Sequence, residues 1–297
     1  MSIEIRPMDM QDISSRKFIP VDMSLNDATE SARSGSMGIG AHPDDLEILA
    51  IRGIGISLNS EQRRFTGVAV TDGSGGTRKE HCKALTEDEI AKKRIEEQNL
   101  AAMLGKYALQ YNLMCKSADI RDPDAEPSKV LVKEISDIVH TVQPNVIYTH
   151  SPFDNHPTHV AVMRAVVEAL RSLPGGVQPL ELYGCEVWGS LDWLPDGRKK
   201  IMDVTKFTTL QRQLISAHES QHDENRSYEE ATVWREFSNA AWACPRIKDV
   251  KAAALGVDLM PLLHRPELSI YDFAKEILRE FEAERLALLN KYLHREP

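Results

Sequence analysis

The sequence predicts an α/β fold with a mostly parallel sheet, and two observations support this prediction. Short apolar segments alternate with longer segments in which apolar residues recur at helical spacing. Strands that alternate with helices imply βαβ units. A length of 297 residues, 42% of them hydrophobic and 27% charged, is enough to bury one large core. We therefore expect a Rossmann-like sheet flanked by helices.

The individual elements follow from local patterns. Strands are expected over residues 37–41, 65–71, 109–114 and 146–149, and helices over 87–104, 127–139 and 157–170. In the first helix, Leu85, Ile90, Ile95, Leu100 and Leu104 are spaced for one buried stripe, and Gly105 ends it. Pro127 and Pro157 suit the first position of the other two helices.

The pattern changes after residue 175. Residues 182–188 and 200–204 flank the turn-forming tripeptide Pro195-Asp196-Gly197, which predicts a C-terminal β-hairpin or a loosely paired sheet edge. Helices are expected over residues 206–218 and 271–293.

The domain organisation is expected to be simple. Residues 1–35 have mixed charge and no clear period, so we expect an N-terminal arm laid over the domain or across a neighbouring subunit. Residues 36–297 form a single domain in this prediction, and residues 228–297 are its helical C-terminal extension.

Charge and cysteine usage limit the partners. A net charge of −9 and a pI near 5.6 argue against binding nucleic acid, which usually requires a basic surface. The four cysteines are widely spaced without a C-x-x-C pair, which is typical of reduced thiols. No signal-peptide pattern or long apolar run occurs. We expect a soluble cytoplasmic protein that acts on a small molecule and has no membrane partner.

Two polar clusters follow two of the predicted strands. His42, Asp44 and Asp45 come directly after strand 37–41, and a His- and Asp-rich run, residues 150–159, follows strand 146–149. Ligands of open α/β sheets bind at the carboxyl ends of the strands. The two clusters can therefore meet at one metal ion.

The residue types suit a catalytic metal. Such a zinc site usually has three protein ligands and one open position, and His42, Asp45 and His159 can supply the three. Asp44 is then free to act as a general base. A site with two histidines and one aspartate also accepts Fe²⁺ or Co²⁺.

The second cluster can also supply a catalytic hydrogen-bond donor. If a helix begins at Pro157, His156 and His159 both project from its first turn, so His156 can donate to a developing oxyanion. The alternative reading of either cluster is a helix N-cap with surface histidines.

Five motifs together resemble those of the LmbE/PIG-L-type N-deacetylases. They are Ala41–Glu47 for A-H-P-D-D-x-E, Thr71–Gly76 for D-G-x-x-G, Arg94–Glu97 for R-x-E-E, Asp154–His159 for D-x-H-x-D-H, and His218–Gln221 for H-x-S-Q. The chain departs from the pattern at Thr158, where family members commonly have Asp.

This resemblance implies a metal-dependent hydrolase that removes the acetyl group from an N-acetylglucosamine-type sugar conjugate and releases a free amine and acetate. It implies the following roles: His42, Asp45 and His159 as Zn²⁺ ligands, Asp44 as general base, and His156 as electrophilic histidine. A homo-oligomer is also expected, because the family often forms one.

The substrate-facing residues are less closely defined. The candidates are Asp72, Arg78, Arg94, Asp154 and His218. Arg78 follows a Gly-rich loop and is available to a sugar or an anionic group. Arg94 either pairs with Glu97 on its own helix or supports the site. His218 is either a helix-end residue or a pocket residue, and Trp193 is either a core anchor or a platform for a sugar ring.

Three other functions remain open. A metal phosphoesterase acting on a sugar phosphate would suit the Gly-rich loop, but that chemistry needs more cationic groups near the metal. The loop also lacks the spacing of a nucleotide-binding P-loop. A non-catalytic ligand-binding module is the second alternative, since a fold does not determine function. An amidase that cuts a larger acyl group is the third.

Overall fold

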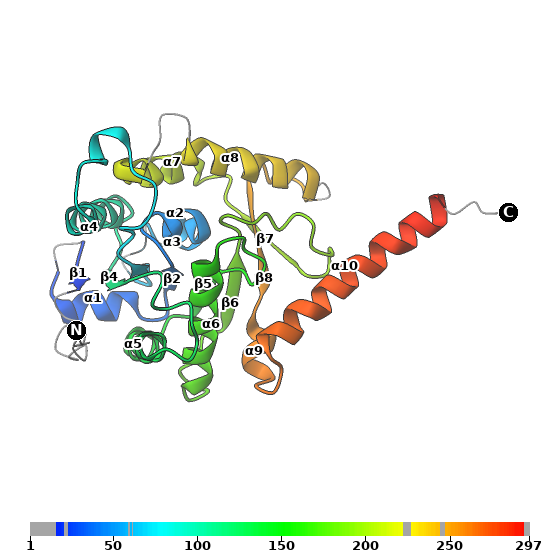
Figure 1. The fold of residues 1–297 in the computed structure, drawn as a ribbon, viewed down its shortest axis with the longest axis horizontal. Helices are drawn as coiled ribbons and strands as arrows, with labels where there is room; N and C mark the ends of the chain where they lie inside the picture. The colour runs from blue at the N-terminus through cyan, green and yellow to red at the C-terminus, as the bar shows by residue number, and fades with distance from the viewer. Residues whose placement is uncertain are drawn as a thin grey trace, which may run out of the picture.

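The computed structural model describes residues 16–20, 23–58, 60, 62–221, 227–243 and 247–293. Its elements (Figure 1) are, in order, β1 (Lys17–Phe18), α1 (Leu25–Ala32), β2 (Ser36–Gly40), α2 (Asp45–Leu49), α3 (Ile51–Ser57), β3 (Thr66–Thr71), the short helix η2 (Glu80–Cys82), α4 (Glu87–Leu104), β4 (Leu109–Cys115), α5 (Glu126–Val142), β5 (Val146–His150), α6 (Pro157–Ser172), β6 (Glu181–Cys185), β7 (Lys199–Asp203), α7 (Thr208–Ser216), the short helix η3 (Glu219–Gln221), α8 (Tyr228–Ser238), the π-helical turn η4 (Asn239–Ala243), β8 (Ala253–Asp258), α9 (Met260–His264) and α10 (Ile270–Tyr292).

One sheet contains all eight described strands, in the order β1-β4-β3-β2-β5-β6-β8-β7. The five strands from β4 to β6 are parallel. β1 is antiparallel to β4, and β8 is antiparallel to both β6 and β7. The predicted α/β fold with a mostly parallel sheet is therefore confirmed. The strand order reverses between β2 and β5, because β3 and β4 lie on one side of β2 and β5 and β6 on the other.

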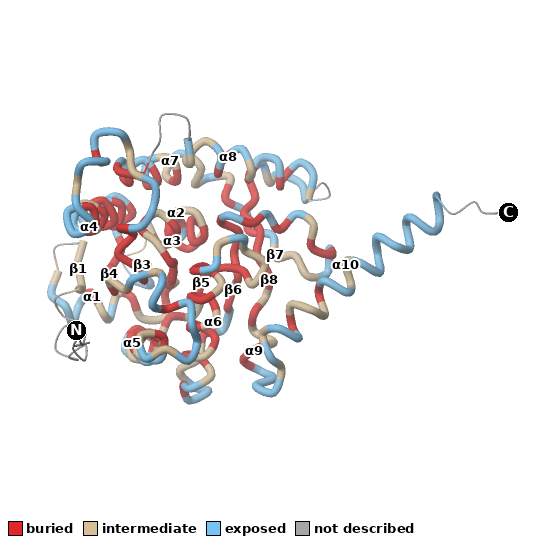
Figure 2. The backbone as a smooth tube through the Cα atoms, viewed as in Figure 1, coloured by how far each residue is buried: buried red, intermediate tan, exposed pale blue. Residues whose placement is uncertain are grey.

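Helices cover both faces of the sheet (Figure 1). Helices α1, α5, α6 and α9 lie on one face, and α2, α3, α4, α7 and α8 lie on the other. Val162, Val166 and Leu170 recur at helical spacing along α6 and are fully buried. Figure 2 shows the buried residues concentrated in the sheet and on the inner sides of these helices. The site at the strand ends therefore rests on a packed core.

Helix α4 has the predicted bounds, but its buried face differs from the prediction. A capping box of Thr86 and Glu89 starts the helix. The expected apolar stripe is wrong, because Leu100 and Leu104 are exposed whereas Arg94 is buried. The inward face carries Arg94, Glu97 and Gln98, which contact the site, beside Ala102, which packs in the apolar core.

Of the two alternatives for residues 182–204, the hairpin is wrong, whereas the sheet edge is confirmed because β7 is the last strand of the sheet. Strands β6 and β7 do not pair with each other, because β8 lies between them and is antiparallel to both. The segment that forms β8, residues 253–258, has no alternation of polar and apolar residues, and its first five residues are buried. Residues 228–297 thus add a strand to the sheet besides their helices.

The described part of residues 1–35 joins the sheet and the core, and the division into an arm and a domain stays a prediction. β1 pairs with β4 and forms one edge of the sheet, and α1 packs against the core through Ala28 and Ala32. Residues 1–15 and 21–22 of the arm lie outside the described residues.

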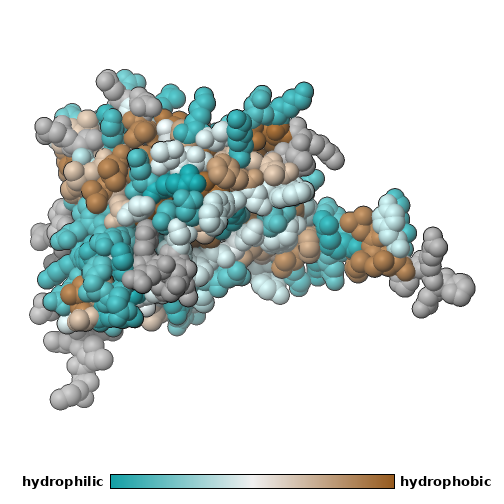
Figure 3. Space-filling view, turned by 90° about the horizontal axis from the view of Figure 1, so that it is seen from above, coloured by the Kyte–Doolittle hydropathy of each residue, from teal (hydrophilic) through white to brown (hydrophobic). Residues whose placement is uncertain are grey.

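Helix α10 leaves the body of the protein (Figure 2). Phe273 and Ile277 near its start are buried, whereas Leu286, Leu288 and Leu289 near its end are exposed. Figure 3 shows this projecting end with apolar side chains on its surface. Although α10 has 23 residues, neither it nor another described helix is apolar enough to span a membrane. The expected homo-oligomer stays a prediction.

Glu236 of α8 is a buried carboxyl group at the contact between α7 and α8. The side-chain amide of Gln211 donates to its Oε1 at 2.9 Å, and its Oε2 has no hydrogen-bond partner among the described residues. Burial raises the pKa of Glu236 from 4.5 to about 7. Ionisation at this position therefore opposes folding.

We predict that Glu236→Gln stabilises the protein in a pH-dependent manner. Because the folded pKa is the higher one, wild-type stability is retained below pH 4.5 and falls as the pH rises through about 7. The free energies of unfolding should be nearly equal near pH 5, and the variant should be more stable by about 1–3 kcal/mol near pH 8.5. Denaturant unfolding at both pH values measures this. An equal difference at both would contradict it, and Glu282→Gln on the exposed side of α10 is the control.

Candidate metal centre and active-site pocket

The site lies where two neighbouring strands end. β2 and β5 are adjacent and parallel, with Gly38 opposite Tyr148. The first polar cluster follows β2 and leads into α2, and the second follows β5 and leads into α6. The strand order reverses between these two strands, which is the usual ligand-binding position of an open α/β sheet.

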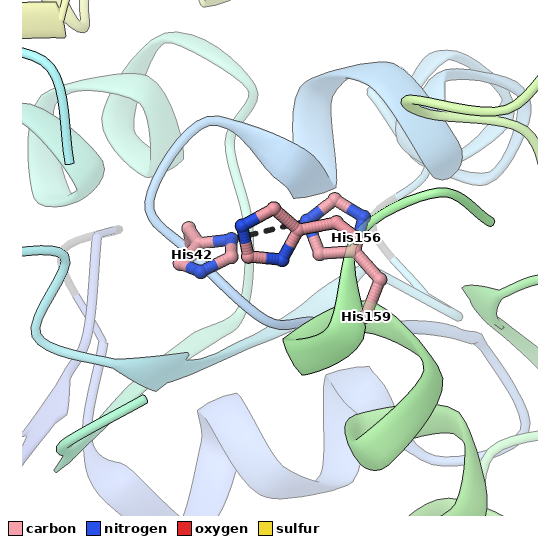
Figure 4. A group of neighbouring side chains, drawn as sticks. All are labelled: His42, His156 and His159. Carbon is pink, nitrogen blue, oxygen red and sulfur yellow. Dashed lines mark hydrogen bonds between the residues drawn. The ribbon is translucent and has the colours of Figure 1, made fainter. Parts of the chain in front are cut away.

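The three residues predicted as metal ligands face one another. Asp45 Oδ2 lies 3.3 Å from His42 Nδ1 and 3.4 Å from His159 Nε2, and the two nitrogens are 3.1 Å apart. Figure 4 shows His42 on the loop after β2, and His156 and His159 at the start of α6, with their rings directed toward a common centre. Ligand atoms of a tetrahedral zinc lie about 3.3–3.4 Å apart, given bonds of about 2.0–2.1 Å. The donor set and its spacing therefore fit one such ion.

Two further histidines border this group. His150 Nε2 lies 3.3 Å from Asp45 Oδ2, and the ring centroids of His42 and His156 are 4.8 Å apart. The backbone amide of Ala41 donates to His150 Nε2 at 2.8 Å, so the lone pair of that nitrogen is already engaged. The sequence interpretation gave His150 no role. Its position as the last residue of β5, inside the second cluster, is the signal that could have identified it.

Asp45 is a fully buried carboxylate among these histidines. Its Oδ2 also accepts a hydrogen bond from the backbone amide of His42 at 2.7 Å. Burial acts to raise the pKa of Asp45, but His159 and His150 hold it well below its usual range. Asp45 is therefore ionised and available to a cation.

Asp154 supports His159 from behind. Its Oδ1 lies 3.1 Å from His159 Nδ1 and accepts a hydrogen bond from the backbone amide of His156 at 2.8 Å. Its Oδ2 accepts a hydrogen bond from the backbone amide of Trp188. A carboxylate in this position fixes the ring orientation of a metal-binding histidine. Asp154 does not line the pocket, although it was a substrate-binding candidate.

Asp44 differs from its neighbour Asp45. It has a φ of 95°, an uncommon backbone conformation for a residue other than glycine. Its carboxylate lines the pocket and makes no hydrogen bond to the described residues. Burial, followed by the charge of Asp45, raises the pKa of Asp44 to about 7. Burial, followed by the charge of His42, lowers the pKa of His156 to about 4, which favours a neutral imidazole.

His42, Asp44, Asp45 and His156 line a pocket of about 350 Å³. Small-molecule sites commonly have volumes of roughly 300–1,000 Å³. Gly73, Gly75, Gly76 and Thr77 of the Gly-rich loop also line the pocket, as do Arg94 and Gln221. Further lining residues are Ser117, Arg121, Trp188 and Tyr228. The structure therefore brings Arg94 to the pocket together with the two proposed catalytic residues.

The Gly-rich loop is held in shape by side chains proposed to contact substrate. Gly73 has a φ of 68°, and its carbonyl oxygen accepts a hydrogen bond from the buried guanidinium of Arg94. Asp72 accepts hydrogen bonds from Ser74 and pairs with Lys116 at 2.7 Å. Arg78 donates to the carbonyl oxygens of Leu85 and Ser74. Neither Asp72 nor Arg78 lines the pocket.

Residues 218–221 tie the site to the helices behind it. His218 is fully buried, with its Nε2 3.2 Å from Glu47 Oε2, and it does not line the pocket. Ser220 donates to Glu97 through its amide and its hydroxyl. Gln221 donates to the carbonyl oxygen of Pro43 at 2.8 Å. This segment therefore positions the loop that carries Asp44 and Asp45.

Trp193 and Trp188 lie in different surroundings. Trp193 packs edge-on against Phe153 and Phe281, which is the core role weighed above. Trp188 lines the pocket, 6.2 Å from Tyr228 between ring centroids. The pocket tryptophan is thus Trp188, and the sequence pattern alone did not distinguish it.

Comparison with known proteins identifies a family for the part of the chain that contains the site. Residues 37–170, which contain both clusters, match the sequence profile of the PIG-L family, described as GlcNAc-PI de-N-acetylase. Residues 37–170 are therefore identified as a PIG-L family domain. The resemblance to this deacetylase family is thereby confirmed.

Individual proteins that resemble this chain have low sequence identity to it. The uncharacterized deacetylase YaiS of Escherichia coli (strain K12) is 27% identical over 156 residues, which cover 50% of this chain and 74% of YaiS. The structure of N,N'-diacetylchitobiose deacetylase from Pyrococcus horikoshii has a TM-score of 0.59 at 19% identity, covering 86% of this chain and 89% of that one.

A third similar structure shows that the fold alone does not determine the reaction. GalB, a 4-carboxy-2-hydroxymuconate hydratase from Pseudomonas putida KT2440, has a TM-score of 0.56 at 17% identity, covering 76% of this chain and 96% of that one. A deacetylase and a hydratase thus both have folds similar to that of this chain. The reaction therefore has to be inferred from the residues of the site.

We predict that Asp154→Asn weakens metal binding without unfolding the protein. The loss of the carboxylate behind His159 should lower metal affinity by roughly 10- to 100-fold, the usual effect of removing such a partner. Competition with a chromogenic chelator measures the affinity, and thermal unfolding of the metal-free variant checks the fold. An unchanged affinity would show that Asp154 does not support a metal ligand.

Proposed function

We propose that the protein is a metal-dependent N-deacetylase that removes the acetyl group from an N-acetylglucosamine-type sugar conjugate, giving a free amine and acetate. The observation that carries this proposal is the meeting of His42, Asp45 and His159 within 3.4 Å, beside a free Asp44 carboxylate in a pocket. The PIG-L match supports the same reading.

In this proposal, His42, Asp45 and His159 hold one divalent ion, and zinc is the first choice because two imidazoles and a carboxylate suit it. Fe²⁺ and Co²⁺ accept the same ligands. The bound ion would supply Lewis-acid chemistry to the amide carbonyl.

The remaining steps belong to side chains. Asp44 takes a proton from the water that attacks the carbonyl carbon, and later returns it to the nitrogen as the C–N bond breaks. A ring N–H of His156 donates to the carbonyl oxygen as negative charge develops on it. One water molecule is consumed, and the proton of the new carboxyl group passes to the amine, so the products are an ammonium group and acetate and both atoms and charge balance.

The pocket supports a sugar as the carrier of the acetamide. Trp188 and Tyr228 present aromatic surface, while the backbone between Gly73 and Thr77 presents polar groups, which together suit a ring with one apolar face and several hydroxyls. We also infer a reducing compartment such as the cytoplasm, because Cys82, Cys115 and Cys185 are free thiols.

We predict that His42→Ala, Asp45→Ala and His159→Ala each abolish most metal binding. Each substitution removes one of three protein ligands, whereas the apolar core is unchanged, so thermal stability of the metal-free protein should fall only modestly. Metal content after dialysis measures binding. Retention of full metal by one variant would remove that residue from the proposed ligand set, and His81→Ala, on the exposed η2, is the control.

Asp44→Asn should retain the metal and lower kcat by roughly 10²- to 10⁴-fold, the usual contribution of general acid–base catalysis. His156→Ala should also retain the metal and lower kcat, because only the oxyanion donor is lost. Steady-state kinetics and metal analysis of the same preparations test both. Loss of metal from Asp44→Asn would make Asp44 a ligand, contrary to the proposal.

The function itself is tested by acetate release. The metal-loaded protein should release acetate from N-acetylglucosaminides, and a chelator should stop the release. If instead it releases phosphate from sugar phosphates and leaves every N-acetylated sugar intact, the phosphoesterase alternative replaces the proposal. Retention of activity after complete removal of metal would contradict the role of the ion.

A further inference from the structure

Arg121 is a positively charged residue that lines the pocket. It follows β4 in the chain, its side chain is exposed, and it lines the pocket with His156 and Trp188. Within the described residues, no carboxylate oxygen lies within 4.0 Å of its guanidinium. Its loop contains Asp119, Asp122 and Asp124, but none of them lines the pocket.

The guanidinium is nevertheless fixed in position. Arg121 Nε donates to the hydroxyl of Thr158 at 3.0 Å. Thr158 is fully buried in the first turn of α6, between His156 and His159. This single tether leaves the terminal nitrogens of Arg121 without a hydrogen bond to the described residues. A held guanidinium with free terminal nitrogens is suited to bind two oxygens of one carboxylate or phosphate.

Neighbouring cations are already engaged. Arg94, also in the pocket, donates to the carbonyl oxygens of Gly73 and Thr77. Lys116 pairs with Asp72 and Glu87, and Arg78 donates to backbone carbonyls. Arg78 was considered above as an anion-binding residue, but Arg121 suits that role better because it lines the pocket and Arg78 does not. The acidic protein as a whole repels anions, so the positive charge at Arg121 is a local feature of the pocket.

We propose that Arg121 recognises an anionic group, a carboxylate or a phosphate, on the sugar conjugate that the enzyme deacetylates. This inference rests on the proposed function and specifies the substrate class. The sugar ring contacts Trp188 and Tyr228, the acetamide faces His156 and Asp44, and the anionic substituent reaches Arg121.

Three probes test the proposal by acetate release: methyl N-acetylglucosaminide, N-acetylglucosamine 1-phosphate and a carboxymethyl N-acetylglucosaminide. The wild type should favour an anionic probe in kcat/KM by about tenfold, the usual worth of a charge-assisted hydrogen-bonded contact. Arg121→Gln should reduce the anionic-to-neutral ratio by a similar factor, mainly through KM. The preferred anionic probe distinguishes phosphate from carboxylate. An absence of preference in the wild type, or an unchanged ratio in the variant, would overturn the proposal.

Two substitutions of Thr158, whose hydroxyl accepts the hydrogen bond from Arg121, provide a second test. Thr158→Asp adds a carboxylate beside Arg121 and should reduce the anionic-to-neutral ratio, whereas Thr158→Ser retains the hydroxyl and should preserve it. Thermal unfolding checks that both variants fold. A folded Thr158→Asp enzyme with the full wild-type ratio would contradict the role of the charge of Arg121.

Binding distinguishes failure of this inference from failure of the proposed function. Calorimetry compares glucosamine 1-phosphate and methyl glucosaminide, which need no turnover. If no probe is deacetylated, the proposed function fails. Arg121-dependent preference for the phosphate would then still support an anion site, and equal binding by wild type and Arg121→Gln would exclude it.

Discussion

The site depends on one buried carboxylate oxygen. Asp45 Oδ2 accepts a hydrogen bond from the backbone amide of His42. It also lies within 3.4 Å of a side-chain nitrogen of each of His42, His150 and His159. It thereby joins the loop after β2 to the end of β5 and the start of α6. A buried charge of this kind is costly unless it is fully paired. The same cost makes a bound cation favourable at this point.

The surrounding structure keeps two adjacent aspartates chemically different. Asp45 begins α2 and is turned inward among histidines, whereas Asp44, at a φ of 95°, lines the pocket with a carboxylate that makes no hydrogen bond to the described residues. Glu47, Glu97 and the segment 218–221 hold this arrangement from behind. One face of α4 is therefore polar where a sequence pattern would place core residues, because that face supports the site.

Much of the fold follows from the sequence, since buried parallel strands and amphipathic helices leave strong local patterns. β8 does not, because its small residues lack alternation and its two partners are distant in the chain. The two clusters could be paired from the sequence because adjacent parallel strands end at one edge. The engagement of Arg78 by backbone carbonyls, the burial of His218 and the tether of Arg121 depend on contacts between distant segments, which no local pattern encodes.

The central claim is that these residues bind one catalytic metal ion. Anomalous diffraction from a crystal of the metal-loaded protein, collected on both sides of the absorption edge of the metal, tests it most directly. The account predicts one strong anomalous peak per chain, within bonding distance of His42, Asp45 and His159 and adjacent to Asp44. A fully loaded protein with no peak there, or with its peak at other residues, would contradict the account.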